Sequence, residues 1–124
     1  MDFLEEFNNH IKKIKKKNLA VVVEGKRDKI ALTKLDLKNI FTLNSSLYDV
    51  CEKIASNFDE VIILTDRDKE GKKLYINLKQ NFDRCGVKIN NDFRNFLFKY
   101  SKLSHIEGID TYIQNIQNRS FDNK

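Results

Sequence analysis

Residues 61–71 read Val-Ile-Ile-Leu-Thr-Asp-Arg-Asp-Lys-Glu-Gly. The first four are apolar without alternation, which is typical of a strand buried on both faces in the middle of a parallel sheet. An earlier run of the same kind, Leu-Ala-Val-Val-Val at residues 19–23, is followed by Glu24. Because Asp66 and Asp68 follow the later run, we expect the two strands to bring three carboxylates to the carboxyl edge of one sheet. Open α/β sheets bind their ligands at that edge.

The remaining apolar spacing predicts strands and helices in alternation. We expect a helix over residues 2–17, strands at 19–24, 40–43, 60–65 and 87–89, and helices near 29–35, 47–58, 69–84, 93–100 and 109–116. This order predicts an α/β fold with a four-stranded parallel sheet sandwiched between helices. Residues 104–124 are expected to form a C-terminal helix and a polar tail, which frays from Asn118 onward.

Residues 1–18 are expected to form an extra, N-terminal basic amphipathic helix. Its apolar residues recur at three- and four-residue steps, as Phe7, Ile11 and Ile14 do. The lysines near its end are Lys12, Lys13, Lys15, Lys16 and Lys17. They form either a solvated helix end whose charge complements the helix dipole, or a contact for phosphates near the sheet edge.

Length and composition limit the classes of protein that fit this chain. Its 124 residues and 14.6 kDa are typical of one domain. The net charge of +5, from 23 basic and 18 acidic residues, mildly favours a polyanion as partner. Cys51 and Cys85 lack the spacing of a zinc site, so we expect buried free thiols in a reducing cytosol. With neither a signal-peptide pattern nor a run of membrane-spanning length, a cytoplasmic protein without a membrane partner is expected.

The three acids of the two apolar runs suggest a metal site. If Glu24, Asp66 and Asp68 converge, their mutual repulsion raises their pKa values unless a cation lies between them. An all-oxygen set of ligands favours Mg²⁺, with Mn²⁺ as a substitute, and such ions serve phosphodiester chemistry by also binding phosphate oxygens. The alternative is structural, because an Asp between a strand and a helix is often an N-cap.

The two acidic motifs together resemble the Toprim domain. This domain is shared by type IA and type II topoisomerases, bacterial-type primases, OLD-family nucleases, recombination mediators and the 5S ribosomal RNA maturase. The family has a Glu after its first strand and an Asp-x-Asp, followed by a Gly, after its third. The matching residues here are Glu24, Asp66, Asp68 and Gly71. The resemblance covers residues 19–103, and the segment Val-Val-Glu-Gly-Lys-Arg-Asp at 22–28 is most similar to the maturase branch and to small stand-alone Toprim proteins.

The resemblance implies a role for each matching residue. It implies that Glu24 is a general acid/base and possible metal ligand, and that Asp66 and Asp68 bind Mg²⁺. Lys26 is a second candidate catalytic residue. The candidates for binding nucleic acid or phosphate are Lys26, Arg67 and Gly71. For Gly71, the expectation is that it lets a helix N-terminus approach the site.

Two further residues have open interpretations. Asp28 is either a ligand of a second ion or, as we expect, a cap of the helix that follows it. His105 either assists proton transfer or, as the local sequence favours, is a surface or capping residue at the start of a helix.

Two functions remain open at this stage. The first is a Mg²⁺-dependent enzyme that acts on phosphodiester bonds, as a nuclease or an RNA- or DNA-processing factor. The second is a non-catalytic, metal-dependent module or accessory subunit that binds nucleic acid or a nucleotide. A homodimer or a protein partner fits either function, because the sequence has no RNP-like aromatic motif and no dense Arg stripe.

Three other classes of protein are not expected. A strand-passing topoisomerase needs a nucleophilic tyrosine on a separate domain, whereas the four tyrosines here have the spacing of helix-face residues. Receiver domains and haloacid-dehalogenase-type phosphatases also place acids at strand ends. Their acid pairs follow the first strand, whereas Asp66 and Asp68 follow the third.

Overall fold

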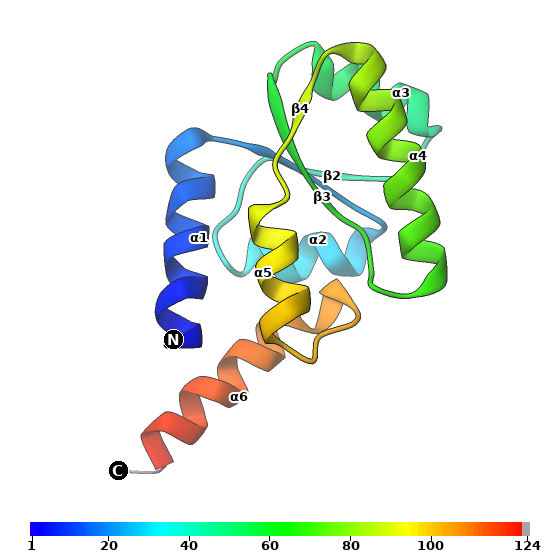
Figure 1. The fold of residues 1–124 in the computed structure, drawn as a ribbon. Coiled ribbons are helices and arrows are strands. Elements are labelled where there is room, and N and C mark those ends of the chain that lie inside the picture. Colours follow the sequence, from blue (N-terminus) through cyan, green and yellow to red (C-terminus); the bar gives the residue numbers. More distant parts are fainter. Residues whose placement is uncertain (123–124) are drawn as a thin grey trace.

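The computed structural model describes residues 1–122 and has one parallel sheet with helices on both sides (Figure 1). Its elements, in chain order, are α1 Phe3–Lys17, β1 Ala20–Val23, α2 Lys26–Thr33, β2 Ile40–Thr42, α3 Leu47–Ala55, β3 Glu60–Leu64, α4 Lys69–Cys85, β4 Lys88–Ile89, α5 Asp92–Tyr100, the 3₁₀ helix η1 Ile106–Gly108, and α6 Ile109–Asp122. The predicted α/β fold is confirmed, and each expected strand is present.

The four strands are all parallel and lie in the order β2-β1-β3-β4. The two apolar runs form the central pair, in which Val23 of β1 lies beside Leu64 of β3. Both side chains are fully buried. Because the two strands are parallel neighbours, the residues that follow them emerge at the same edge of the sheet.

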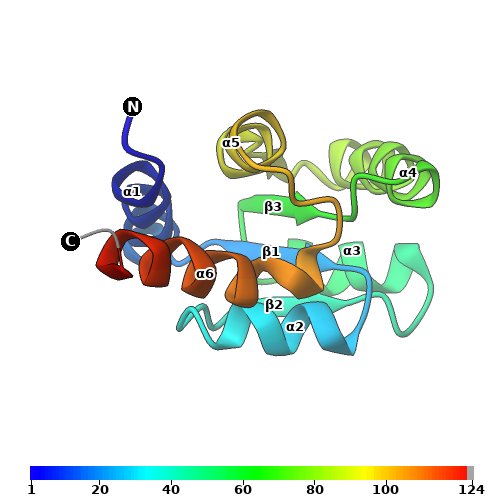
Figure 2. The same ribbon diagram turned by 90° about the horizontal axis from the view of Figure 1, so that it is seen from below.

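Two hydrophobic cores lie on opposite faces of the sheet, because alternate strand residues point to opposite sides. Val21 and Ile62 contribute to the core under α1, α2, α5 and α6. Val22 and Ile63 contribute to the core under α3 and α4. Figures 1 and 2 show α3 and α4 on one side of the sheet and α1 and α5 on the other. The sheet is therefore sandwiched between helices, as the sequence predicts.

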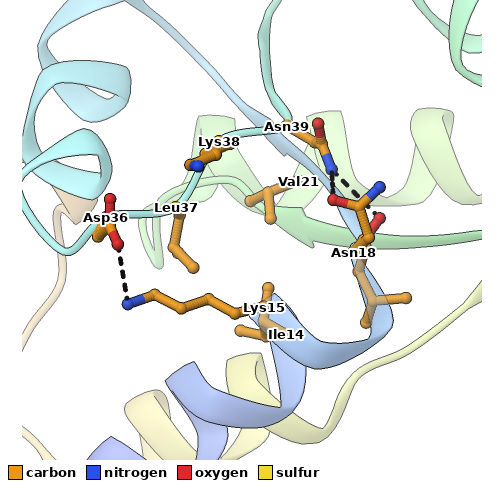
Figure 3. Close-up of a pocket in the computed structure, with 9 residues that line it drawn as sticks. Ile14, Lys15, Asn18, Val21, Asp36, Leu37, Lys38 and Asn39 are labelled. Atoms are coloured by element: carbon orange, nitrogen blue, oxygen red, sulfur yellow. Dashed lines mark hydrogen bonds and ion pairs between the residues drawn. The ribbon is translucent and has the colours of Figure 1, made fainter.

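Helix α1 packs on the sheet through its predicted apolar stripe, in which Phe7, Ile11 and Ile14 are buried. The helix ends at the amino ends of the strands, where the Asn39 side-chain amide donates to Asn18 Oδ1 at 2.7 Å. A cavity of about 220 Å³ lies beside this contact (Figure 3). The lysine-rich end of α1 is therefore at the edge of the sheet opposite to Glu24.

Some boundaries differ from those expected. Helix α2 begins at Lys26 rather than near residue 29, because the Gly25 amide donates to Asp28 Oδ2 at 3.0 Å and caps the first turn. Helix α6 continues through residues 118–122, beyond the expected start of the frayed tail, and residues 123–124 lie outside the described part. Within residues 1–122, no helix combines the length and the apolar character that crossing a membrane requires.

The two cysteines are free, as expected, but they differ in environment. Cys51 lies in the core between α3 and the sheet, and burial raises the pKa of its thiol to about 11. Cys85 is exposed, which corrects the expectation of two buried thiols. The reason is its position at the last residue of α4, where the chain leaves the core at Gly86.

Candidate metal and phosphate site

Glu24 and Asp66 meet because β1 and β3 are adjacent and parallel. The Asp66 backbone amide donates to Glu24 Oε2 at 2.6 Å. Partial burial raises the pKa of the Glu24 carboxyl above its usual range. The hydrogen bond from the Asp66 amide opposes this effect, and the negative charges of Asp66, Asp68 and Asp28 add to it. Glu24 is thus a fixed carboxylate with an increased tendency to hold a proton.

Each Asp of the Asp-x-Asp motif is also fixed by a backbone amide. The Ile106 amide donates to Asp66 Oδ1 at 2.8 Å. Asp68 is the N-cap of α4, and its Oδ1 accepts from the Gly71 amide at 2.8 Å. The capping interpretation is therefore correct for Asp68, although the cap occupies one carboxylate oxygen and leaves Oδ2 for another contact.

Gly71 allows α4 to begin directly against the Asp-x-Asp loop. A Cβ atom at this position would overlap the Asp66 carbonyl oxygen and lie 2.6 Å from the carbonyl carbon. The Thr65 hydroxyl donates to the Gly71 carbonyl oxygen at 2.7 Å and closes the same turn. The expected close approach of the helix N-terminus is present. The Gly71 amide itself is bonded to Asp68, and its binding to phosphate stays a prediction.

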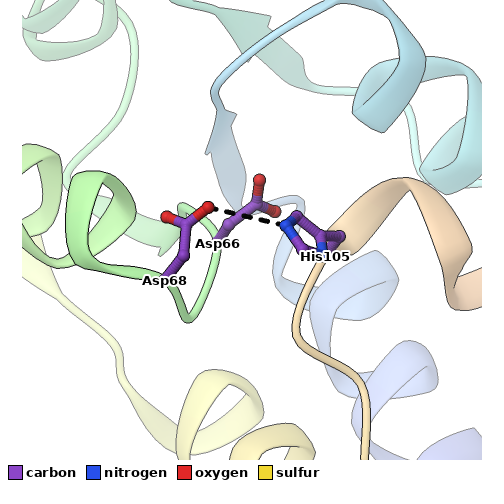
Figure 4. A group of neighbouring side chains, drawn as sticks. All are labelled: Asp66, Asp68 and His105. Carbon is purple, nitrogen blue, oxygen red and sulfur yellow. Dashed lines mark ion pairs between the residues drawn. The ribbon is translucent and has the colours of Figure 1, made fainter.

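His105 joins the two Asp residues, which the local sequence did not indicate (Figure 4). Asp66, Asp68 and His105 each offer one ligand atom, and these atoms lie within 4.8 Å of one another. His105 Nε2 is 3.5 Å from Asp68 Oδ2. The loop that carries His105 is attached to the motif, because the Arg67 amide donates to the Ser104 carbonyl oxygen at 2.8 Å. His105 is exposed and is the N-cap residue of η1, so the preferred interpretation as a surface or capping residue is confirmed, and its position beside Asp66 and Asp68 is an additional finding.

The chemistry of these donors fits a divalent metal ion. Glu24, Asp66 and Asp68 each direct one oxygen to a backbone amide, and the second oxygen of each accepts no hydrogen bond from residues 1–119. The imidazole of His105 adds a nitrogen donor to the Asp pair. Carboxylate oxygens with one such nitrogen suit Mg²⁺ or Mn²⁺. Glu24 adjoins this three-residue cluster through the Asp66 amide.

Asp28 has a structural role, as expected. Its carboxylate is buried and caps α2 through the Gly25 amide. Burial raises the pKa of Asp28, and the charges of Asp66 and Glu107 act in the same direction. The capping interpretation of this residue is confirmed.

Lys26 and Arg67 have different neighbours. Lys26 is exposed on the first turn of α2 and lines a cleft of about 360 Å³ together with Glu24, Asp66 and His105. Arg67 is also exposed, but its guanidinium lies over the Phe98 ring, 5.9 Å from the ring centre. Lys26 is therefore the better placed of the two to reach a phosphate beside Glu24.

Arg94 is a buried cation beside the site, and no expectation from the sequence included it. One guanidinium nitrogen, Nη1, donates to the carbonyl oxygens of Thr65 at 2.8 Å and Ile63 at 3.2 Å. The guanidinium also lies between the rings of Tyr75 and Phe98, at 4.6 and 4.7 Å. Burial lowers its pKa, whereas the charges of Tyr75, Glu24 and Asp66 raise it. Arg94 thus fixes the end of β3 from which the Asp-x-Asp loop emerges.

Comparisons with known proteins place this geometry in a family. The Toprim domain matches residues 20–99. The chain is similar to a UPF0292 protein of Methanosarcina barkeri, with 31% identity over 121 residues, covering 94% of this chain and 85% of that protein. It is also similar to a UPF0292 protein of Pyrococcus horikoshii, with 34% identity over 107 residues, covering 86% of this chain and 80% of that protein.

A solved structure agrees with these sequence relatives. It is described as a putative protein from Aquifex aeolicus and superposes with a TM-score of 0.75 at 33% identity. The match covers 84% of this chain and 95% of that one. A particular likeness to the 5S ribosomal RNA maturase branch stays a prediction. Because the family match includes β1, β3 and both acidic motifs, this chain belongs to the Toprim domain family, whose members bind divalent metal ions and function with nucleic acids.

Proposed function

We propose that this protein cleaves or processes phosphodiester bonds of nucleic acid, with Mg²⁺ bound at the carboxyl edge of its sheet. One observation carries the proposal. Three carboxylates from two adjacent strand ends are each held by a backbone amide through a single oxygen. Such preorganisation of charged groups is what phosphoryl-transfer sites need, because charge stabilisation and positioning supply most of the catalysis.

Asp66 and Asp68 would hold the ion through their second oxygens, with Glu24 as a further ligand. Mn²⁺ is the expected substitute, since His105 Nε2 lies beside Asp68. A divalent cation bound there would neutralise the charge that develops on the phosphate oxygens during cleavage. The aligned amides keep the carboxylates in place whether or not the substrate is bound.

Glu24 is the proposed general acid/base. Its Oε2 is engaged by the Asp66 amide, so a proton would be exchanged at Oε1, with the attacking or the leaving oxygen. Partial burial, which raises the pKa of Glu24, helps this carboxyl to hold that proton closer to neutral pH. Lys26, in the same cleft, would contact the phosphate during the reaction.

The second candidate function is a metal-dependent binding module or accessory subunit without turnover. The cleft itself favours it, because its lining includes four acids, Glu24, Asp28, Asp66 and Glu107, against Lys26, Arg27 and His105. An acidic cleft attracts a nucleic acid weakly when no metal is bound. In this alternative a partner protein or a second copy of the chain would supply the catalytic or gripping surface.

Cleavage of labelled single-stranded, duplex and structured RNA and DNA, in Mg²⁺, Mn²⁺ or EDTA, separates the two functions. Glu24→Gln and Asp66→Asn should each lower the cleavage rate at least about 100-fold, the scale of general acid/base catalysis. Glu107→Gln is the control, because it removes an acid from the same cleft without touching the held carboxylates.

Binding of Mn²⁺, followed by electron paramagnetic resonance, completes the test. We expect Glu24→Gln to retain most of the metal affinity and Asp66→Asn to lose it. If the wild-type protein binds metal and nucleic acid but cleaves none of the panel, the enzyme proposal is wrong and the accessory module is correct.

A further inference from the structure

Beside the acidic cleft lies a second depression with a different chemical character. It is an open groove of about 780 Å³ between α2 and the residues that follow β2. Ligand pockets usually measure about 300–1,000 Å³, so the groove can hold a small organic group. We propose that it binds one unpaired nucleotide next to the phosphate that is cleaved. The placement beside a scissile phosphate rests on the proposed function, whereas the binding itself does not.

The floor of the groove is aliphatic. Ile30 projects from α2 with 47% of its surface exposed. Leu43 lines the groove from the opposite side. An exposed Ile and a second aliphatic residue in the same groove offer an apolar surface against which the flat face of a base can be buried.

The rim of the groove is basic. Lys26 and Lys29 lie on α2, Lys34 is its C-cap residue, and all three line the groove together with Ile30. Lys34 pairs with Asp110 at 3.8 Å. Lys26 and Lys29 have no carboxylate within 4 Å among the side chains of residues 1–119, so their charge is available to a phosphate.

The groove and the acidic cleft form one continuous surface. Both are lined by Glu24, Gly25 and Lys26. The Leu43 amide donates to the Glu24 carbonyl oxygen at 3.3 Å, which joins the floor of the groove to the proposed general acid/base. A nucleotide whose base lies on Ile30 and Leu43 would therefore direct its own phosphate along Lys26 toward Glu24.

The apolar floor and the lysine rim together favour an unpaired nucleotide as the ligand of the groove. A base in a duplex has both faces covered by its stacking neighbours, so it cannot rest on an aliphatic surface unless it is unpaired. The lining described here contains no aromatic ring, and Asn44 at its end is the one side-chain amide. We therefore expect modest affinity with little dependence on base identity. A second copy of this face is a poor occupant, because lysines would oppose lysines across a two-fold axis.

The test measures binding in EDTA, so that it is independent of cleavage. Fluorescein-labelled tetranucleotides of RNA and of DNA are titrated with the wild-type protein, alongside the same sequence enclosed in a hairpin stem. We expect the single strands to bind more tightly, with nuclear magnetic resonance shifts at the Ile30 and Leu43 amides. Ile30→Glu and Lys29→Glu should each weaken binding about tenfold, which corresponds to roughly 1.4 kcal/mol.

Two matched controls lie on α4, far along the chain from the groove. Ile76 is also an exposed isoleucine, at 55%, and Lys73 is also an exposed lysine. Ile76→Glu and Lys73→Glu introduce the same chemical changes and should weaken binding less than about twofold, as expected of a screened surface charge. Equal losses in the groove and control variants would overturn the proposal, as would equal affinity for the stem.

Sedimentation of the wild-type protein tests whether a second copy of the chain occupies the groove instead. If the wild-type chain forms a dimer that Ile30→Glu disrupts, the groove is an interface between copies and the nucleotide proposal is wrong. Binding in the groove and cleavage activity can fail independently of each other. Groove binding without any cleavage refutes the enzyme alone. Cleavage with unchanged binding in Ile30→Glu refutes the groove alone.

Discussion

The two edges of this parallel sheet are both charged, but only one is constructed as a site. At the carboxyl edge, Glu24, Asp66 and Asp68 each accept a hydrogen bond from a backbone amide. For Glu24 and Asp66 the amide comes from a distant part of the chain, and for Asp68 it comes from the same turn. At the amino edge, the lysines of α1 are exposed, and the pair that Lys15 makes with Asp36 joins two exposed side chains (Figure 3).

The carboxylates are therefore held in fixed positions, whereas the lysines of α1 are exposed to water. Holding an acid against its neighbours costs free energy, and a backbone amide offsets that cost at each position. Exposed lysines need no such support, because water solvates them. We therefore expect substitutions that weaken the support of the carboxyl edge to have larger effects than substitutions of exposed lysines.

The largest effect is expected from closing the gap that Gly71 leaves. In Gly71→Ala the new Cβ would overlap the Asp66 backbone, which forces α4 away from the Asp-x-Asp loop. We expect a loss of about 2–3 kcal/mol in the free energy of unfolding, as for overpacked interiors, and a loss of metal affinity. Urea unfolding followed by circular dichroism and Mn²⁺ titration measure the two effects.

Gly25 provides the matched control for this substitution. It also follows a site acid, but a Cβ there meets no atom within 4 Å, and its backbone is extended. Gly25→Ala should cost at most about 1 kcal/mol, the price of a poorer N-cap. If the two alanine variants are equally stable, the tight turn at Gly71 does not support the carboxyl edge.

The next largest effect is expected from replacing Arg94, the buried cation at the end of β3. Arg94→Met should lower the free energy of unfolding by about 2 kcal/mol, because it leaves the carbonyl oxygens of Ile63 and Thr65 without their buried donor. Arg67→Met is the control, since both guanidiniums lie over Phe98 but Arg67 is exposed. We expect the control to stay within about 0.5 kcal/mol of wild type by the same urea measurement. Similar values for both variants would show that the buried hydrogen bonds of Arg94 contribute nothing.

The sequence was sufficient for the fold because its strongest signals were local. The unalternating runs at residues 19–23 and 61–64 could be buried only as central parallel strands, and they are β1 and β3. The acids that follow them then had to emerge at one edge. The contact between Glu24 and Asp66 is a direct consequence of that topology.

The sequence failed where a residue reached the site through tertiary structure. His105 comes to Asp68 by way of the loop after α5, and no local pattern encodes that path. Arg94 lies between Phe93 and Phe96 on a helix that packs against the sheet, and a charged residue among such apolar neighbours was the signal that could have revealed it. Both residues depend on where α5 and the following loop dock, which residue spacing alone does not determine.

The smallest effect is expected from charge reversal at the amino edge. Lys16→Glu with Lys17→Glu should change the cleavage rate of a short oligonucleotide less than about twofold at 0.1 M salt. The four residues of β1 separate these lysines from Glu24, a length of roughly 13 Å at about 3.3 Å per residue. That distance exceeds the Debye length of about 10 Å at this ionic strength.

Lys26→Glu is the counterpart at the carboxyl edge. We expect it to lower the cleavage rate about tenfold, because a charge-assisted contact to phosphate contributes about 1.5 kcal/mol or more. Repeating both measurements at 0.01 M salt sharpens the comparison. The Debye length then reaches about 30 Å, so the α1 variant should begin to slow cleavage while the ratio between the two variants shrinks. A strong effect of the α1 lysines already at 0.1 M would mean that a short substrate contacts both edges, and the division between a chemical edge and a solvated edge would be wrong.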